Sequence, residues 1–470
     1  METVDLLLTH GLIVTQDNNR TIISDGAIAV NTDRIVAIGP TDDVVARYTP
    51  KETLDVTGSA VFPGLINSHI HLFQTGVKGL GEDMKVQDWV EAVTAPTAIH
   101  INPEEMYLFC LTGCLEQIQC GVTTLIDMSY AAHTFALHDT NIKAMTDSGL
   151  RSRYSTIISD FGLDYGVLPE LIKPIDQFLE EYVRLQDKYP ASDLLAVWLA
   201  IGAPWTVTDE GIKKTRAFAN RTGTPIIMHI NENEVDNKLS QERYGKNIVP
   251  YLADVGFLGA DLLAIHCVVT DDTDIELYVK HDVKISYNPV SNMYLGSGIA
   301  PIMQMAEAGL TICIGTDGAG SNNSQDMIES LKFAALLQKV AARDASVIDA
   351  QTILDWATRD AARVVGLSDE IGSLETGKKA DMFVLTPNSA KIVPVHDPVA
   401  TLVYSSGEEN VTTTIVGGKI LMRDGIIQHM DEEDVLWRCQ QAALNLADRC
   451  GSNRKLARFW RPKRKIHETI

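Results

Sequence analysis

Histidines and a carboxylate that could bind a metal ion stand at separated points of this 470-residue chain. His69 and His71 form a His-x-His pair, and His229, His266 and Asp317 follow far downstream. Neutral imidazoles combined with one carboxylate suit Zn²⁺ or Fe²⁺, and such a set leaves a coordination position for water. The residue types therefore predict a site for a catalytic divalent metal, with Zn²⁺ as the favoured ion and Fe²⁺ as the alternative.

All five residues fall at the carboxyl ends of predicted strands. His69 and His71 follow an apolar strand, and alternation in an extended segment points residues i and i+2 to the same side. His229 lies at the end of the segment IIMHI, His266 is the last residue of LLAIH, and Asp317 follows ICIGT. A single buried histidine is more often an ordinary core residue. Agreement of all five residues with strand ends favours one shared site.

A further carboxylate, Glu232, stands three residues beyond His229. Activation of water by a metal needs a base that takes the water's proton, and a carboxylate just past a ligand can reach that water. We therefore predict Glu232 as the catalytic base. Two alternatives stay open: Glu232 could instead satisfy free amides at a helix start, and Glu234 is the competing base.

The elements that must position these residues are short apolar segments that alternate with stretches of helical periodicity. Examples of such helical stretches are residues 103–119 and 273–281. The predicted strands cover residues 61–66, 123–128, 151–158, 194–201, 225–230, 262–268, 283–287 and 310–314. Parallel strands with crossover helices close into a barrel. We therefore expect an α/β fold, a distorted (β/α)8 TIM barrel, over residues 59–369.

Both ends of the chain are rich in β-forming residues. Strands are predicted at residues 5–15, 27–31, 34–38, 381–385, 401–404, 412–416 and 419–423. We expect residues 1–58 and 370–428 to form one small β-sandwich domain beside the barrel. Helices are predicted at 325–342, 349–360, 361–365 and 434–448. The last of these helices and a basic tail at 454–465 belong to a C-terminal segment, residues 429–470.

Composition excludes several classes of partner. The net charge of −22 creates a long-range field that repels phosphates, so we expect neither nucleic acid nor membrane as a partner.

The seven cysteines are odd in number and form no C-x-x-C pair, which is typical of reduced core thiols. Acidic residues precede the first apolar run, where a signal peptide has basic ones. We expect a cytoplasmic protein.

Blocks of sequence around these residues resemble the amidohydrolase superfamily, and in particular its branch of aromatic deaminases and chlorohydrolases. The blocks that match, in order, are PGLINSHIH, HINE, AIHCV, NPVSNMYLGSGIAP, GTDGAGSNNSQDM and ETGKKADMFVL. This branch contains methylthioadenosine and S-adenosylhomocysteine deaminases, and also s-triazine hydrolases such as atrazine chlorohydrolase. The resemblance implies that His69, His71, His229 and Asp317 are the metal ligands.

The resemblance also implies a role for each remaining polar residue. Glu232 becomes the acid/base that shuttles the proton, His266 hydrogen-bonds the attacking hydroxide, and Asp317 passes a proton to the leaving group. In binuclear relatives a lysine ends the fourth strand, whereas this chain has LAIGAP there, so one metal ion is expected. The implied reaction is deamination of a small nitrogen heterocycle, with a purine nucleoside or base favoured.

Four residues are candidates for binding the substrate. Glu82 matches a glutamate that nucleoside deaminases of this branch aim at ribose hydroxyls, although it could equally be a solvated loop acid. Trp89 either anchors the same loop or stacks on the base. Asn292 offers a polar contact or stabilises a turn. Trp205 stands where nucleoside deaminases commonly carry a histidine, and it offers only a flat apolar surface and one N–H donor.

Because of that difference, other functions stay open. A triazine-type hydrolase that displaces chloride or an alkylamino group is the alternative, followed by hydrolysis of a carbamate-like C–N or C–S bond. A barrel that serves only as a structural or interaction protein would be expected to lack a ligand, and every predicted ligand is present. The expected partner is a small heterocyclic substrate, and barrels of this type imply a homodimer or homotetramer.

Overall fold

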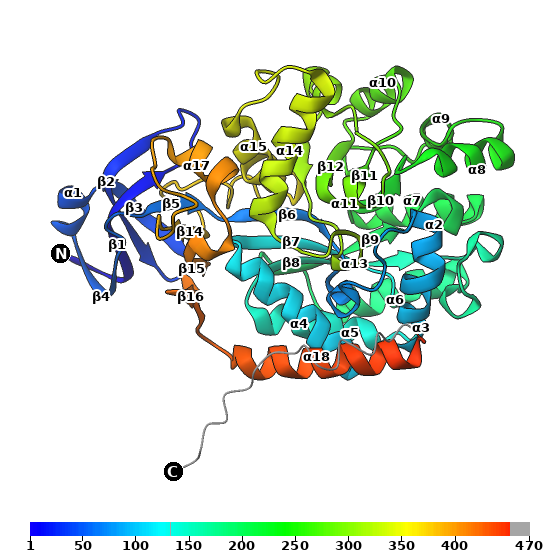
Figure 1. Cartoon of the computed structure of the whole chain (residues 1–470), viewed down its shortest axis with the longest axis horizontal. Helices are drawn as coiled ribbons and strands as arrows, with labels where there is room; N and C mark the ends of the chain where they lie inside the picture. Colours follow the sequence, from blue (N-terminus) through cyan, green and yellow to red (C-terminus); the bar gives the residue numbers. More distant parts are fainter. Residues whose placement is uncertain (132, 452–470) are drawn as a thin grey trace, which may run out of the picture.

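Two sheets organise the chain, which is described here by a computed structural model covering residues 1–131 and 133–451. The larger is an eight-stranded parallel sheet, and the smaller is a nine-stranded mixed sheet at one end of the molecule (Figure 1). Within these residues, none of the helices has the length and apolar character needed to cross a membrane.

The parallel sheet pairs its strands in chain order, and its last strand lies beside its first, so the sheet forms a nearly closed barrel. This confirms the predicted TIM-like barrel. Its strands are β6 (Leu65–Ile70), β7 (Val122–Ser129), β8 (Arg151–Ile158), β9 (Leu195–Ile201), β10 (Ile226–Ile230), β11 (Leu262–His266), β12 (Lys284–Tyr287) and β13 (Ile312–Ile314). Helices cover the barrel from outside, so every residue of β7 and β8 is buried.

Several of the helices that surround the barrel begin with a side-chain cap. The first of them occupies the predicted residues 103–119: Pro103 stands at its first position, and Asn102 and Glu105 exchange hydrogen bonds in a capping box. The covering helices are α4 (Pro103–Gln119), α5 (Ala136–Ser148), α6 (Ile175–Lys188), α7 (Asp209–Thr222), α8 (Glu234–Tyr244), α9 (Ile248–Asp254), α10 (Asp272–Lys280), α12 (Ile302–Glu307) and α14 (Met327–Ala342). Of these, the helices with a side-chain cap are α4, α7, α8, α10 and α14.

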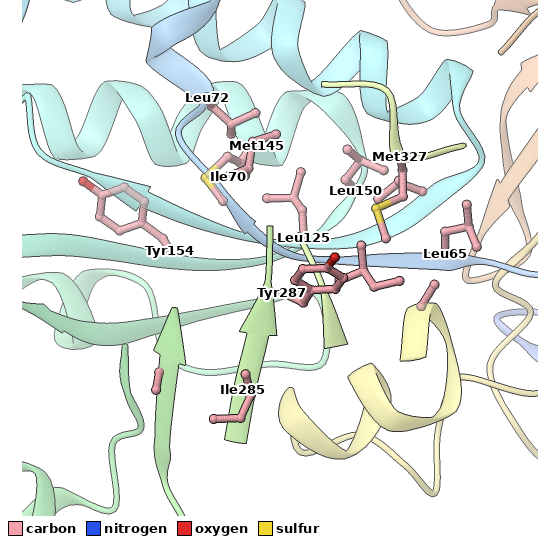
Figure 2. Close-up of a cluster of buried hydrophobic side chains, with 14 of the residues drawn as sticks. Leu65, Ile70, Leu72, Leu125, Met145, Leu150, Tyr154, Ile285, Tyr287 and Met327 are labelled. Carbon is pink, nitrogen blue, oxygen red and sulfur yellow. The ribbon is translucent and has the colours of Figure 1, made fainter. Parts of the chain in front are cut away.

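Shorter helices carry the loops above the barrel and the return of the chain. They are α2 (Val86–Trp89), a π-helical turn Val90–Thr94, α3 (Ala95–His100), the 3₁₀ turn η5 (Pro204–Thr206), α11 (Pro289–Tyr294), α13 (Ala319–Asn322), α15 (Ala350–Ala357) and α16 (Arg359–Val364). Apolar side chains from strands and helices fill the space between them. Leu125, Tyr154 and Tyr287 come from three different strands in the part of this core that Figure 2 shows.

The first barrel strand begins later than the predicted 61–66 segment. Val61 and Phe62 belong to β5 (Ala60–Pro63), which pairs with β1 (Glu2–Val14) and β14 (Met382–Leu385) in the mixed sheet. The change of sheet occurs at Gly64. Its N–H donates to the backbone carbonyl of Asp381, which precedes β14, whereas the N–H of Leu65 donates to the backbone carbonyl of Gly121, which precedes β7. A Cβ on Gly64 would lie 2.1 Å from Thr123 Oγ1, so only glycine lets the chain pass so close to β7.

Both ends of the chain meet in the mixed sheet, as the sequence predicted. Its order is β17-β16-β15-β14-β5-β1-β2-β3, with β4 paired to β1. The remaining strands are β2 (Ile22–Asn31), β3 (Arg34–Pro40), β4 (Tyr48–Asp55), β15 (Val411–Val416), β16 (Lys419–Arg423) and β17 (Ile426–Ile427). One core cluster gathers side chains from β1, β2, β14 and β15. Strand β4 was not among the predicted strands.

One predicted strand at this end is wrong. Residues 401–404 lie in helix α17 (Pro398–Ser405). Asp397 caps this helix by accepting a hydrogen bond from the Ala400 N–H, and Pro398 occupies its first position. These start signals outweigh the strand-forming side chains that follow.

The chain then crosses the outside of the barrel as α18 (Glu432–Arg449), which confirms the predicted helix at 434–448 and packs against α4 (Figure 1). Arg438 pairs with Glu104 at 2.9 Å across this contact. The predicted basic tail at 454–465 lies outside the described residues.

Candidate metal centre and cavity

The four side chains predicted to bind metal converge above the barrel. The Nε2 atoms of His69 and His71 lie 3.4 Å and 3.3 Å from Asp317 Oδ1, and His229 Nε2 lies 3.3 Å from His69 Nε2. In a tetrahedral zinc site with bonds of about 2.0–2.1 Å, ligand atoms stand about 3.3–3.4 Å apart. The spacing and donor types of this cluster therefore suit a divalent metal ion.

The imidazoles are oriented by the backbone of neighbouring strands. His71 Nδ1 hydrogen-bonds the carbonyl of Met128, and His229 Nδ1 hydrogen-bonds the carbonyl of Gly202. Donation from Nδ1 leaves the lone pair on Nε2, the atom that faces the cluster. Burial lowers the pKa of His69 to about 4 and also lowers the pKa of His71 and His229. The three rings are therefore neutral, as metal ligands must be.

Asp317 is held as a carboxylate. Burial alone would raise its pKa, but its contacts with His69 and His71 outweigh burial and hold that pKa well below the ordinary value. Ser291 Oγ donates to its Oδ2 at 2.5 Å, and the Gly318 N–H donates to its Oδ1 at 2.6 Å. The side chain is therefore fixed from two further directions.

The backbone at these strand ends adopts conformations that non-glycine residues rarely take. Asp317 has φ +60° and His266 has φ +74°, both in the left-handed region. The chain also passes very close to itself here, because a Cβ on Gly315 would lie 2.9 Å from the Cβ of His69. Local strain of this kind is typical of functional sites, where the surrounding structure holds it in place.

Glu232 and His266 stand together beside the cluster. Glu232 Oε2 lies 4.0 Å from His266 Nε2, and His266 Nδ1 lies 2.9 Å from Asn292 Oδ1. Burial, and then the charge of Asp317, raises the pKa of Glu232 to about 8. Pairing of Nδ1 with an acceptor puts the imidazole proton there, so His266 turns an unprotonated Nε2 toward Glu232.

A cavity of about 830 Å³, counted out to its open mouth, lies over these groups. Its polar part includes His71, His229, Glu232, His266 and Asp317, together with Gln74, Thr94, Tyr130, Ser159 and Thr206. The rest of its wall is mostly carbon, with contributions from Val86, Val90, Ala95, Ile157, Val167, Leu171 and Leu295. Among the described residues that line it, none is a lysine or an arginine.

The candidates for substrate binding divide into two groups. Trp89 and Trp205 line the cavity. Glu82 and Asn292 are not among its lining residues: Glu82 is half-buried in the loop that precedes α2, and Asn292 is buried behind His266, to which it hydrogen-bonds. Asn292 thus contacts a predicted catalytic residue rather than the cavity.

Several polar residues of the site were not predicted from the sequence. Tyr130 and Gln74 line the cavity and are joined by a hydrogen bond of 2.7 Å between Gln74 Nε2 and the tyrosine hydroxyl. Ser291 holds Asp317, and Asp236 accepts hydrogen bonds from Trp205 and from the backbone of Glu232. The one sequence signal for these residues is that Ser291 lies inside one of the blocks that match the family. Tyr130, Gln74 and Asp236 act through neighbours that are distant in sequence.

Curated relatives match almost the whole chain. A 5-methylthioadenosine/S-adenosylhomocysteine deaminase of Syntrophobacter fumaroxidans is 32% identical over 440 residues, which cover 93% of this chain and 98% of the relative. A 5'-deoxyadenosine deaminase of Methanosarcina mazei is 34% identical over 451 residues, covering 95% of this chain and all of the relative (100%).

Solved structures share the architecture. A zinc-bound adenosine deaminase from Xanthomonas campestris superposes with a TM-score of 0.88 at 28% identity, over 95% of this chain and 99% of that one. Atrazine chlorohydrolase from Arthrobacter aurescens, complexed with zinc and atraton, gives a TM-score of 0.86 at 24% identity, over 93% and 100% of the two chains, a likeness of fold. The sequence model of the amidohydrolase family matches residues 60–421. By this match and by the identity of its relatives, the chain belongs to the amidohydrolase family.

Proposed function

We propose that this protein is a deaminase of adenosine-like nucleosides that uses one zinc ion held by His69, His71, His229 and Asp317. The observation that carries the proposal is the position of Glu232, a half-buried carboxyl group that faces the cavity 4.0 Å from His266 and beside the metal cluster. The deaminase names of the relatives support the choice of reaction.

The chemistry divides between the metal and the protein. A divalent ion in the cluster supplies Lewis-acid activation of water at neutral pH. Glu232, in its carboxylate form, takes a proton from the attacking water and gives it to the ring nitrogen next to the attacked carbon, which absorbs the charge that addition creates. His266 accepts a hydrogen bond from the water through Nε2. Asp317 takes the remaining proton of the attacking oxygen and passes it to the departing amine, so water and an amino group become a ring carbonyl and ammonia.

The cavity favours an uncharged substrate. Its wall is mostly carbon, it holds the carboxyl groups of Glu232 and Asp317, and its described lining has no lysine or arginine to pair with a phosphate. A buried anion without a partner is strongly unfavourable. A neutral nucleoside therefore suits this site better than a nucleotide does, and an apolar group at the 5′ position would find carbon surface.

Ammonia release from the zinc-loaded protein tests the proposal. The panel contains adenosine, 5′-deoxyadenosine, 5′-methylthioadenosine, adenosine monophosphate, free adenine and amino-triazines. We expect ammonia and the matching hydroxypurine from the neutral nucleosides, with the monophosphate at least about 100-fold poorer in kcat/KM, because its charge would be desolvated without a partner. The proposal is wrong if metal is bound stoichiometrically and every nucleoside stays unchanged.

Displacement of chloride or an alkylamine from an s-triazine is the second candidate. The observation that favours it is Trp205, whose only hydrogen-bonding group is engaged by Asp236 and so is withheld from a nucleoside base. Chloride and alkylamine are assayed in the same panel with chloro- and alkylamino-triazines. Release of either from triazines, together with silence on the nucleosides, would replace the first function by this one.

A further inference from the structure

Asp236 is tied to two residues of the active site, although it does not itself line the cavity. It lies in the first turn of α8, and its side chain is buried. Its Oδ1 accepts a hydrogen bond of 3.1 Å from Trp205 Nε1, and its Oδ2 accepts one of 2.9 Å from the backbone N–H of Glu232. One carboxylate therefore joins a wall of the cavity to the residue that we propose transfers the proton.

The same helix holds the turn that carries Trp205 at two more points. Arg243, near the end of α8, donates to the carbonyl of Pro204 at 3.1 Å and to the carbonyl of Val207 at 3.0 Å. These carbonyls flank Trp205 on both sides. The turn after β9 and the loop after β10 are thus cross-linked through α8, with Asp236 at the end nearest the cavity.

We propose that Asp236 is a positioning residue that fixes Trp205 as a carbon-faced wall of the substrate cavity and holds the Glu232 loop in register with that wall. The inference rests on the proposed function, because it assigns Glu232 the proton transfer. It deepens that function by adding a source of specificity: recognition at Trp205 works through shape, since its single N–H is already engaged.

A carboxylate suits this role for a simple reason. Both of its oxygens are acceptors, so it can serve two N–H donors at once, whereas an amide has one acceptor and one donor. Asp236→Asn therefore places an N–H group against either the indole of Trp205 or the backbone of Glu232. Trp205→Phe removes only the indole bond and leaves an aromatic wall. The two variants therefore distinguish the effect of the Asp236 hydrogen bonds from the effect of the aromatic surface at position 205.

The kinetic test compares these variants on the best substrate of the panel. We expect Asp236→Asn to lower kcat by about 10- to 100-fold, as misplacement of a catalytic group does. Trp205→Phe should mainly raise KM. In the Trp205→Phe background, Asp236→Asn should cost less than in the wild type, because part of its effect has already been removed. Fully independent effects in this double-mutant cycle, or wild-type kinetics for Asp236→Asn, would overturn the proposal.

Glu105→Gln is the matched control. Glu105 is also a buried carboxylate in the first turn of a helix, and it also accepts a backbone N–H, that of Asn102 at 3.0 Å, but it is not among the residues that line the cavity. We expect this variant to lose thermal stability without a change in kcat. An equal kcat loss in both variants would mean that loosening any helix start slows the enzyme, which contradicts a specific role for Asp236.

A measurement independent of turnover separates this inference from the proposed function. In protein labelled at tryptophan indole nitrogens, the Trp205 N–H signal is identified by its absence in Trp205→Phe. We expect Asp236→Asn to shift this signal and to speed its hydrogen exchange, while Glu105→Gln leaves both unchanged. If the wild type deaminates nothing but the signal responds in this way, the proposed function fails and the link between Asp236 and Trp205 stands; an unaffected signal removes the link itself.

Discussion

Two buried clusters of charged groups stand at opposite ends of the barrel strands, and they are built differently. At the start of β8, Arg151 forms a two-pronged ion pair with Asp381, at 3.0 Å and 3.1 Å, and also donates to the carbonyl of Asp193 at 2.8 Å. Asp381 accepts a further hydrogen bond from the Gly417 N–H at 2.7 Å. Both side chains are almost completely buried, and this pair joins the barrel to the mixed sheet.

At the carboxyl ends of the strands, the metal cluster leaves polar atoms unused. His69 Nδ1 and Asn292 Nδ2 are buried without a hydrogen-bond partner among the described residues, and Asp317 and His266 have left-handed backbones. A fully paired cluster stabilises the contact between two parts of the fold. A cluster with spare donors, neutral imidazoles and strained backbone retains the capacity to bind a ligand, and this difference separates the structural end of the barrel from the functional end.

The largest effect expected from breaking the functional cluster is that of Asp317→Ala. Removing the only carboxylate among the four ligands should abolish both zinc binding and turnover, because the cation loses its one anionic ligand and the reaction loses the group proposed to pass the second proton. Metal content by elemental analysis and ammonia release measure the two losses. A metal-free variant with full activity would show that the cluster is not the catalytic centre.

Glu232→Gln should separate metal binding from catalysis. The amide keeps the size of the side chain but cannot accept and return a proton, so we expect zinc to be retained while kcat falls by about 10²- to 10⁴-fold. Steady-state kinetics and metal content are measured on the same preparation. Glu234→Gln is the control; if it slows the enzyme and Glu232→Gln does not, Glu234 is the base.

Asp381→Ala probes the structural cluster. It leaves the guanidinium of Arg151 buried without its partner, which should cost about 3–5 kcal/mol of the free energy of unfolding. Urea unfolding measures the loss, and kcat of the folded enzyme should stay unchanged. Replacing both partners with apolar side chains, in Arg151→Met/Asp381→Leu, should recover much of the stability. A wild-type unfolding midpoint for Asp381→Ala would show that the Arg151–Asp381 pair does not stabilise the fold, and the contrast between the two clusters would then be wrong.

The smallest effect is expected from Ser291→Ala. Loss of the hydrogen bond to Asp317 Oδ2 should weaken zinc affinity by about 10- to 100-fold, the usual effect of removing a group that orients a ligand. Competition with a chelator measures the affinity. Unfolding in the presence of excess zinc should match the wild type, and a change in stability without a change in affinity would place Ser291 with the structural cluster instead.

Much of the barrel and of the metal site could be predicted because their signals are local. Apolar alternation and helix caps place the strands and helices to within a few residues, and the ligands His229 and Asp317, together with His266, mark strand ends directly in the sequence. Parallel strands in a barrel bring all their carboxyl ends to one face. Convergence of the ligands therefore follows from the fold class without knowledge of any individual contact.

Misplaced predictions have non-local causes. The segment 61–66 reads as one continuous strand, yet it is divided because its hydrogen-bond partners change from the mixed sheet to the barrel at Gly64. The segment 401–404 has strand-forming side chains, but the capped start at Asp397 makes it a helix. In both cases the partner of the backbone, rather than the side chains of the segment, decides the structure.

The sequence by itself determined which residues can hold the metal, in which order the barrel strands come and that a carboxyl group follows the third histidine ligand. Only the tertiary structure decided what each polar group touches: Asn292 contacts His266, Asp236 bonds the indole of Trp205, and Glu82 stays off the cavity wall. The physical reason is one of range. Ligand types and strand ends are properties of short segments, whereas a hydrogen bond between two loops depends on how those loops are folded together.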